Sequence, residues 1–151
     1  AGDRSYAATE QRAIGFQKAL AKKGLHMVGG TPLYGDWSEA WGRTAASALI
    51  SSGQEFDAIF CGNDLLAVGA MLEAERMGLD VPSDLSICGI DNLEISEAIN
   101  PGLTTVSLPT QDLGRIAAQY MLSAISGEVI AAKSLLPFEL VVRGSTGLPR
   151  P

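Results

Sequence analysis

The sequence predicts an α/β fold built on a doubly wound parallel sheet. Two observations lead to this prediction. Segments with helical hydrophobic spacing alternate with short apolar runs, and the run 57–61 is almost continuously apolar. Alternating helices and strands are typical of parallel sheets, and strands covered by helices on both faces are apolar along their whole length. With 151 residues, of which 46% are hydrophobic, the chain is long enough to form a core of its own.

Four helices are predicted from the spacing of apolar residues and from a shared stop signal. A glycine directly follows or ends each of them, and glycine adopts the left-handed backbone that terminates many helices. Strands are predicted in the apolar runs between the helices. The predicted helices are 9–23, 38–52, 64–77 and 110–126, and the predicted strands are 25–30, 57–61, 85–90, 103–108 and 135–142.

Two features predict that the chain is a fragment. The opening Ala1-Gly2-Asp3 is typical of a turn that follows a strand, rather than of the start of a domain. The predicted helix 110–126 carries an apolar stripe that no neighbouring segment covers, and such a stripe needs a packing partner.

Charge and composition argue against several classes of protein. The formal net charge is −6, and no basic stripe is present to neutralise nucleic-acid phosphates. No apolar run approaches the ~18 residues of a membrane span. Two cysteines, Cys61 and Cys88, without a CxxC motif indicate a reducing compartment and neither a disulfide framework nor a zinc site. We expect no cofactor, no metal, no membrane partner and a cytoplasmic location.

Polar residues follow the predicted strands and predict a binding site. Ligands of open α/β sheets bind beyond the carboxyl ends of the strands, and parallel strands bring these ends to one edge. Arg12, Trp37, Asn63 and Asp91 stand in or just after the loops at this edge. We therefore expect these four residues to bind a ligand together.

Each of the four residues also has a structural interpretation. Arg12 and Asp91 either contact a ligand or form an ion pair with each other, because a buried charge needs a partner. Trp37 either offers a flat apolar platform to a sugar or base, or packs against the start of a helix. Asn63 is a favoured helix N-cap, and its amide can also bond a ligand hydroxyl.

No catalytic residue is predicted. His26, the single histidine, lies far in the sequence from any Ser/Asp partner, and we expect it to be structural. Asp36 and Glu39 have the spacing of a capping box, so Asp36 is predicted to cap the helix rather than to bind a ligand. No phosphate-binding glycine motif occurs. The site is therefore predicted to bind without reacting.

Seven short motifs occur in the order seen in the lactose-repressor/galactose-repressor (LacI/GalR) family, and together they span nearly the whole chain. They are Arg12-x-x-Gly15-Phe16, Gly35-Asp36-Trp37-Ser38, Asp57-Ala-Ile-Phe-Cys-Gly-Asn63-Asp64, Gly78-Leu-Asp-Val-Pro82, Leu85-Ser-Ile-Cys-Gly-Ile-Asp91-Asn92, Pro101-Gly-Leu-Thr-Thr-Val106 and Val142-Arg-Gly-Ser-Thr146. Since seven motifs match at the right spacing, the chain resembles the effector-binding domain of these regulators.

The resemblance implies a bacterial transcriptional regulator with a two-lobed effector domain of the periplasmic-binding-protein-like type I fold. Residues 1–107 would form the C-terminal lobe with its first strand missing. Residues 108–134 would be a crossover segment and helix of the absent N-terminal lobe, and 135–151 a return strand and tail. Operator DNA would be bound only by an absent N-terminal helix-turn-helix domain. The helix near 64–77 and the turn at 95–101 would form a homodimer contact.

The resemblance also assigns the effector site to Arg12, Trp37, Asn63 and Asp91. Some relatives contact the effector through a glutamine and an aromatic residue, which Leu108 and Thr110 replace here, so the ligand is expected to differ. The effector is predicted to be a sugar or sugar derivative, acting allosterically. Two alternatives remain open: a periplasmic sugar-binding protein of a transport system, and a small α/β enzyme that acts on sugars.

Overall fold

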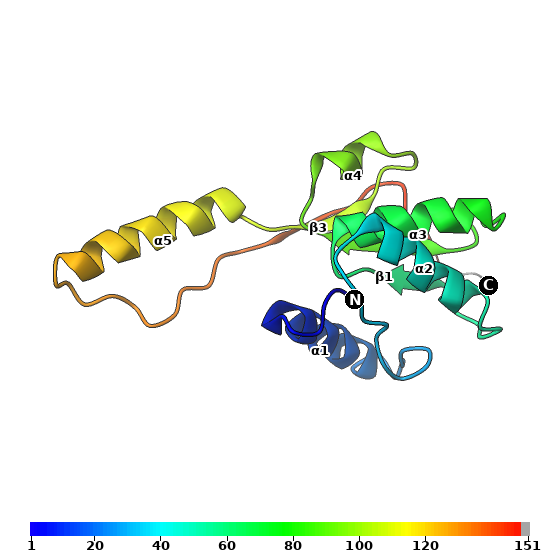
Figure 1. The fold of residues 1–151 in the computed structure, drawn as a ribbon, viewed down its shortest axis with the longest axis horizontal. Coiled ribbons are helices and arrows are strands. Elements are labelled where there is room, and N and C mark those ends of the chain that lie inside the picture. Colours follow the sequence, from blue (N-terminus) through cyan, green and yellow to red (C-terminus); the bar gives the residue numbers. More distant parts are fainter. Residues whose placement is uncertain (149–151) are drawn as a thin grey trace.

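The computed structural model describes residues 1–148 and has the predicted α/β architecture (Figure 1). Its sheet has four strands in the order β1-β2-β3-β4. The first three strands run parallel, and β4 pairs antiparallel with β3. The strands are β1 (Ala58–Phe60), β2 (Ser86–Ile90), β3 (Thr104–Ser107) and β4 (Glu139–Val141).

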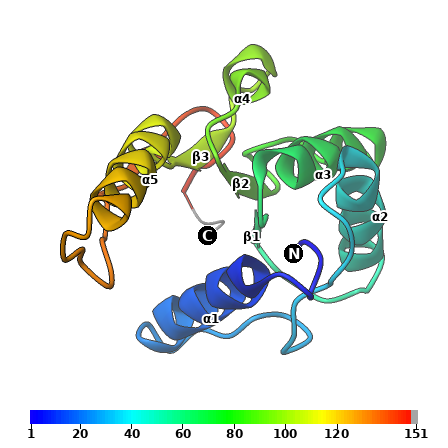
Figure 2. The ribbon, with the colours of Figure 1, turned by 60° about the vertical axis from the view of Figure 1, so that its left-hand side comes forward.

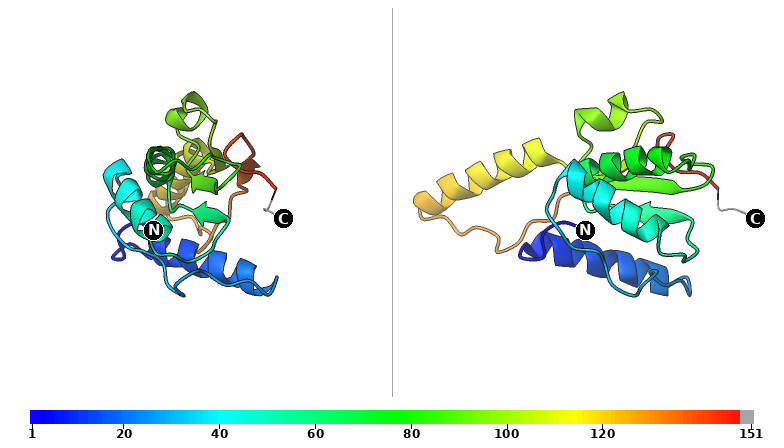
Figure 3. Two further views of the ribbon diagram at one scale, coloured as in Figure 1. Left: turned by 90° about the vertical axis from the view of Figure 1, so that its right-hand side faces the viewer. Right: turned by 45° about the vertical axis from the view of Figure 1, so that its right-hand side comes forward.

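Helix α3 packs on one face of the sheet with α2 beside it. Helix α1 lies apart from them, below β1 (Figures 2 and 3). The rings of Phe16 on α1 and Phe60 on β1 stack with their centroids 4.7 Å apart. The helices are α1 (Ala7–Ala21), α2 (Glu39–Ile50), α3 (Asp64–Arg76), α4 (Glu94–Ala98) and α5 (Thr110–Ile125).

Two strand predictions need correction. Residues 25–30 form no strand, because Gly29 and Gly30 have φ angles of +71° and +73° and turn the backbone. Within residues 1–148, β1 pairs only with β2, so no strand lies beside 25–30. The predicted strand 135–142 shortens to Glu139–Val141, and it joins the sheet antiparallel to its neighbour.

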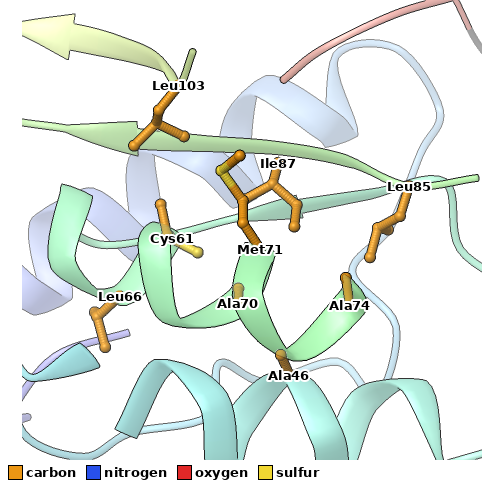
Figure 4. Packing of buried hydrophobic residues seen from close by; sticks show 10 residues of the cluster. Ala46, Cys61, Leu66, Ala70, Met71, Ala74, Leu85, Ile87 and Leu103 are labelled. Atoms are coloured by element: carbon orange, nitrogen blue, oxygen red, sulfur yellow. The ribbon is translucent and has the colours of Figure 1, made fainter. Parts of the chain in front are cut away.

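The core lies between α3 and the sheet (Figure 4). Met71 of α3 points to Ile87 of β2, and Ala46 lies where α2 meets α3. The two helices approach so closely that a Cβ atom on Gly69 would lie 2.1 Å from the backbone oxygen of Glu39. This close approach packs α2 directly against α3.

Helix α5 leaves this body and extends away from it (Figure 1). None of its residues is buried, and the side chains of Leu113, Met121 and Ile125 are 50%, 67% and 78% exposed. The apolar stripe expected from the sequence is therefore uncovered in this structure. The helices of residues 1–148 are all too short or too polar to cross a membrane.

Candidate ligand-binding site

The structure brings all four predicted site residues to one edge of the sheet. Arg12 is on α1, Trp37 precedes α2, Asn63 follows β1 and Asp91 follows β2. The guanidinium carbon of Arg12 lies 5.6 Å from the centre of the Trp37 ring, and its Nη2 atom lies 3.5 Å from Oδ1 of Asp91. Asn63 donates from Nδ2 to the backbone oxygen of Trp37 over 3.4 Å. The predicted convergence is therefore present, although only Asn63 and Asp91 follow strands of this sheet.

Arg12 is the central group of the site. Its Nη1 atom donates to the backbone oxygen of Gly62 over 2.5 Å, on the loop that follows β1. The side chain is 25% exposed, and its charge is shared between Asp91 and the face of Trp37. A cation over an indole face is stabilised by the electrons of the ring. These contacts fix the guanidinium plane and leave part of it open to a ligand.

Asp91 occupies an unusual backbone conformation. Its φ is +114°, and the next residue, Asn92, has φ +53°. Residues other than glycine rarely have a positive φ, and those that do are concentrated at functional sites. Burial raises the pKa of the Asp91 carboxyl, the positive charge of Arg12 opposes this rise, and Asp64 adds to it. The carboxylate is thus costly where it stands and gains from any hydrogen-bond donor that a ligand supplies.

Trp37 is both packed and part of the site edge. A Cβ atom on Gly2 would lie 2.3 Å from its ring, and Tyr6 makes an edge contact with a centroid distance of 6.4 Å. Only a glycine fits at position 2 against this ring. The ring therefore packs against Gly2 and against Tyr6, the N-cap of α1, and these contacts hold it in a fixed orientation next to Arg12.

Asn63 is the N-cap of α3, as one of its two interpretations predicted. Its Oδ1 atom accepts from the backbone N–H of Leu66 over 2.9 Å, and the residue is 7% exposed. Both ends of its amide therefore have partners within the protein. Its role as a ligand contact stays a prediction.

The prediction that Asp36 caps helix α2 is wrong. Ser38, not Asp36, caps α2, because the Ser38 hydroxyl accepts from the backbone N–H of Trp41 over 3.1 Å. Asp36 bonds the N-cap residue itself, because its carboxylate accepts from the backbone N–H of Ser38 over 2.9 Å. A capping box read from spacing alone placed the cap two residues too early.

Two supporting residues were not found from the sequence. Arg143, just after β4, donates from Nη2 to the side-chain oxygen of Asn92 over 2.8 Å and from Nη1 to the backbone oxygen of Leu103 over 2.8 Å. Asp64 is fully buried beneath the same turn. The sequence alone does not reveal either residue's role, because their hydrogen-bond partners lie far away in the chain.

Side chains that commonly bind metals do not cluster in residues 1–148. No group of three or more His, Cys, Asp or Glu side chains there could hold a metal ion. Burial raises the pKa of the thiols of Cys61 to about 12 and of Cys88 to about 11, which keeps both protonated. His26 is exposed, and it lines a cavity between α1 and the sheet.

Comparison with known proteins identifies the fold family. The family model described as a periplasmic binding protein-like domain matches residues 1–146. The transcriptional repressor CytR of Escherichia coli K12 is 36% identical over 136 residues, which cover 89% of this chain and 40% of that protein. The repressor PurR of Erwinia tasmaniensis is 36% identical over 117 residues, which cover 78% of this chain and 34% of that protein.

Solved structures of regulators share the fold. The lac repressor dimer bound to operator and the anti-inducer ONPF has a TM-score of 0.87 and 30% identity, over 97% of this chain and 50% of that chain. The complex of the transcriptional regulator CelR with cellobiose has a TM-score of 0.88 and 30% identity, over 96% of this chain and 45% of that chain. The chain thus spans between a third and a half of these relatives.

These relatives are regulators, and the curated ones are repressors rather than enzymes or transport proteins. The predicted fold and the predicted resemblance are both confirmed. The chain belongs to the periplasmic binding protein-like domain family, and it is similar over nearly its whole length to part of LacI/GalR-type transcriptional regulators.

Proposed function

We propose that Arg12, Trp37, Asn63 and Asp91 bind a small effector, a sugar or sugar derivative. The observation that carries this proposal is the position of the Arg12 guanidinium, between the carboxylate of Asp91 and the ring of Trp37. A hydroxylated ring needs an apolar face, donors and acceptors together, and these side chains supply all three. The relative CelR, which was solved with cellobiose, supports a sugar as the ligand class.

Binding is favoured by the charge balance at the site. Asp91 pairs with Arg12 at 3.5 Å in a partly exposed position, where such pairs contribute little. Hydroxyl donors of a ligand would satisfy the carboxylate oxygens, whose burial raises the pKa of this group. The ligand therefore completes a polar cluster that the protein satisfies only in part.

The proposal assigns residues 1–107 to one lobe, 108–134 to a segment of a second lobe, and 135–151 to the return strand and tail. Residues 149–151 lie outside the described residues. The uncovered stripe of α5 supports this division, since a second lobe would bury it. The bare edge of β1 borders a mostly apolar cavity of about 450 Å³, which fits the missing first strand.

In the whole protein, the effector would lie between the two lobes and shift the population of two lobe arrangements. Such a shift can be no larger than the difference in the effector's affinity for the two states. Operator DNA would be contacted by a separate helix-turn-helix domain. The protein would act as a cytoplasmic homodimer without catalytic activity, and α3 and the turn at 95–101 would contribute to the dimer contact.

A thermal-shift screen of the whole protein tests this function. The compounds are hexoses, cellobiose, phosphosugars, nucleosides and nucleobases. We expect a sugar or sugar derivative to raise the melting temperature, and the Arg12→Lys variant to lose most of the shift. A shift with nucleobases alone would overturn the assignment to sugars. No shift with any of the compounds would count against effector binding at this site.

A further inference from the structure

Asp64, the first residue of α3, is fully buried and has three hydrogen-bond donors around its carboxyl group. Its Oδ1 atom accepts from the hydroxyl of Thr105 over 2.5 Å. Its Oδ2 atom accepts from the backbone N–H of Leu93 over 2.8 Å and from the hydroxyl of Ser96 over 2.5 Å. All three partners lie outside α3, so this carboxyl group connects α3 to β3 and to the start of α4.

We propose that Asp64 is the positioning residue for Asp91, and that it fixes the turn at 91–93 and helix α4 as one unit. The proposal rests on the role of Asp91 in effector binding. Asp64 itself touches no ligand in this account. It acts through the backbone of the turn that carries Asp91.

Three consecutive backbone amides hold this turn. Asp91 donates to the backbone oxygen of Val106 over 2.9 Å, Asn92 to the hydroxyl oxygen of Thr105 over 3.3 Å, and Leu93 to Asp64. Because the Thr105 hydroxyl gives its proton to Asp64, its lone pairs are free to accept from Asn92. Asp64 thereby controls two of the three amides, one directly and one through a hydroxyl.

The turn needs such support because its backbone is strained. Asp91 and Asn92 both have positive φ angles, at +114° and +53°. Residues in such conformations persist only where the surroundings hold them. Without acceptors for Asn92 and Leu93, the turn would relax and the Asp91 carboxylate would move away from Arg12.

The close approach of Asp64 is built into the sheet. A Cβ atom on Gly89, in β2, would lie 2.3 Å from Oδ1 of Asp64 and 3.2 Å from its Cα. Only glycine at position 89 leaves room for the buried carboxyl group. The glycine in β2 thus makes space for the buried carboxyl group of Asp64.

Asp64 also connects the site to the protein surface. Ser96 lies in α4 and is fully buried, whereas Leu93 and Ile95 beside it are 39% and 40% exposed. Since Leu93 and Ser96 bond the same Oδ2 atom, a change at Asp91 reaches this surface through one carboxyl group.

The test uses Asp64→Asn in the whole protein, with Glu73→Gln as the matched control. Both changes convert a buried carboxyl group on α3 to an amide, and Glu73 bonds Arg76 and none of the residues of the turn. Hydrogen exchange is measured by mass spectrometry without ligand, on peptides covering 91–98 and 66–74. We expect Asp64→Asn to speed exchange in 91–98 at least about tenfold over wild type and over Glu73→Gln.

A second pair of variants covers the case in which Asp64→Asn does not fold. Thr105→Val removes the hydroxyl and should speed exchange at 91–98, whereas Thr105→Ser keeps the hydroxyl and should restore the wild-type rate. Exchange at 91–98 that is no faster in Asp64→Asn or Thr105→Val than in Glu73→Gln overturns the proposal.

Binding separates this inference from the proposed function. Cellobiose and adenosine are titrated into wild type, Asp64→Asn, Asp91→Asn and the double variant. A positioning role predicts weaker binding in Asp64→Asn and no further loss when it is added to Asp91→Asn, since both act through one carboxylate. Independent, additive losses contradict positioning. If wild type binds neither compound, the exchange experiment alone decides the inference.

Discussion

Arg12 on α1 and Asp91 after β2 place opposite charges 3.5 Å apart, although the two residues are far apart in the chain. The pair exists because α1 and β2 both present residues to the same edge of the sheet. Trp37 and Asn63 lie at the same edge, within contact of Arg12 or of each other. This shared edge is the basis of the effector site proposed here.

Arg12→Lys is expected to weaken effector binding at least about tenfold, because lysine cannot bond Gly62, pair with Asp91 and lie flat over Trp37 at once. The melting temperature of the unliganded protein should change little. Calorimetric titration checks the affinity. Arg4→Lys serves as the control, since Arg4 pairs with Glu10 on the exposed surface, and it should bind as wild type does.

Asp91→Asn is expected to weaken effector binding while leaving the unliganded protein as stable as wild type or more so. Burial raises the pKa of Asp91, so the folded state disfavours its charge, and asparagine tolerates a positive φ well.

The raised pKa of Asp91 also predicts how the stability difference between Asp91→Asn and wild type changes with pH. For an acid whose pKa is raised on folding, the free energy of unfolding falls as pH rises through the unfolded and then the folded pKa. The stability of Asp91→Asn relative to wild type should therefore grow above about pH 4 and then level off. Urea unfolding between pH 3 and pH 7 measures it, and a gap that shrinks with rising pH would refute the assignment.

Gly69→Ala is expected to destabilise this chain by about 3 kcal/mol, because the new Cβ atom would collide with the backbone oxygen of Glu39, which cannot move independently of α2. Gly114→Ala is the matched control within a helix. Outside its chain neighbours and the nearby backbone of its own helix, no atom lies within 4 Å of its Cβ position, so the change should stabilise the chain by about 0.5–1 kcal/mol. Equal effects of both changes in urea unfolding would contradict the packing of α2 on α3.

The proposed second lobe predicts a difference between this chain and the whole protein. Met121→Gln and Ile125→Gln alter side chains that are 67% and 78% exposed here, so the melting temperature of this chain should not fall. In the whole protein the same changes should lower it, because the stripe would be buried there. Unchanged melting of the whole protein would show that α5 does not pack on a second lobe.

Local signals predicted much of this fold. Gly78 and Gly127 directly follow the C-caps of α3 and α5 with positive φ angles, as the sequence indicated. Gly24 and Gly53 also have positive φ angles, but α1 and α2 end earlier than predicted, with C-caps at Lys22 and Ser51. The convergence of Asn63 and Asp91 was predicted for a different reason, since parallel strands bring their carboxyl ends to one edge of the sheet, and β1 and β2 are parallel.

The sequence predicted less where pairing across the chain decides the outcome. Residues 25–30 are apolar enough for a strand, yet they have no strand neighbour within residues 1–148. Helix α4 is five residues long, too short for a periodic pattern to show. Asp64 has the look of a first-turn acid in sequence, and only the fold brings Thr105, Leu93 and Ser96 to it.

The most direct test of the central claim is calorimetric titration of the whole protein with the compound that gives the largest thermal shift. We expect one bound molecule per chain, with affinity at least about tenfold lower in both Arg12→Lys and Asp91→Asn and unchanged in Arg4→Lys. Binding that is equally tight in all four proteins would place the effector elsewhere and contradict the account.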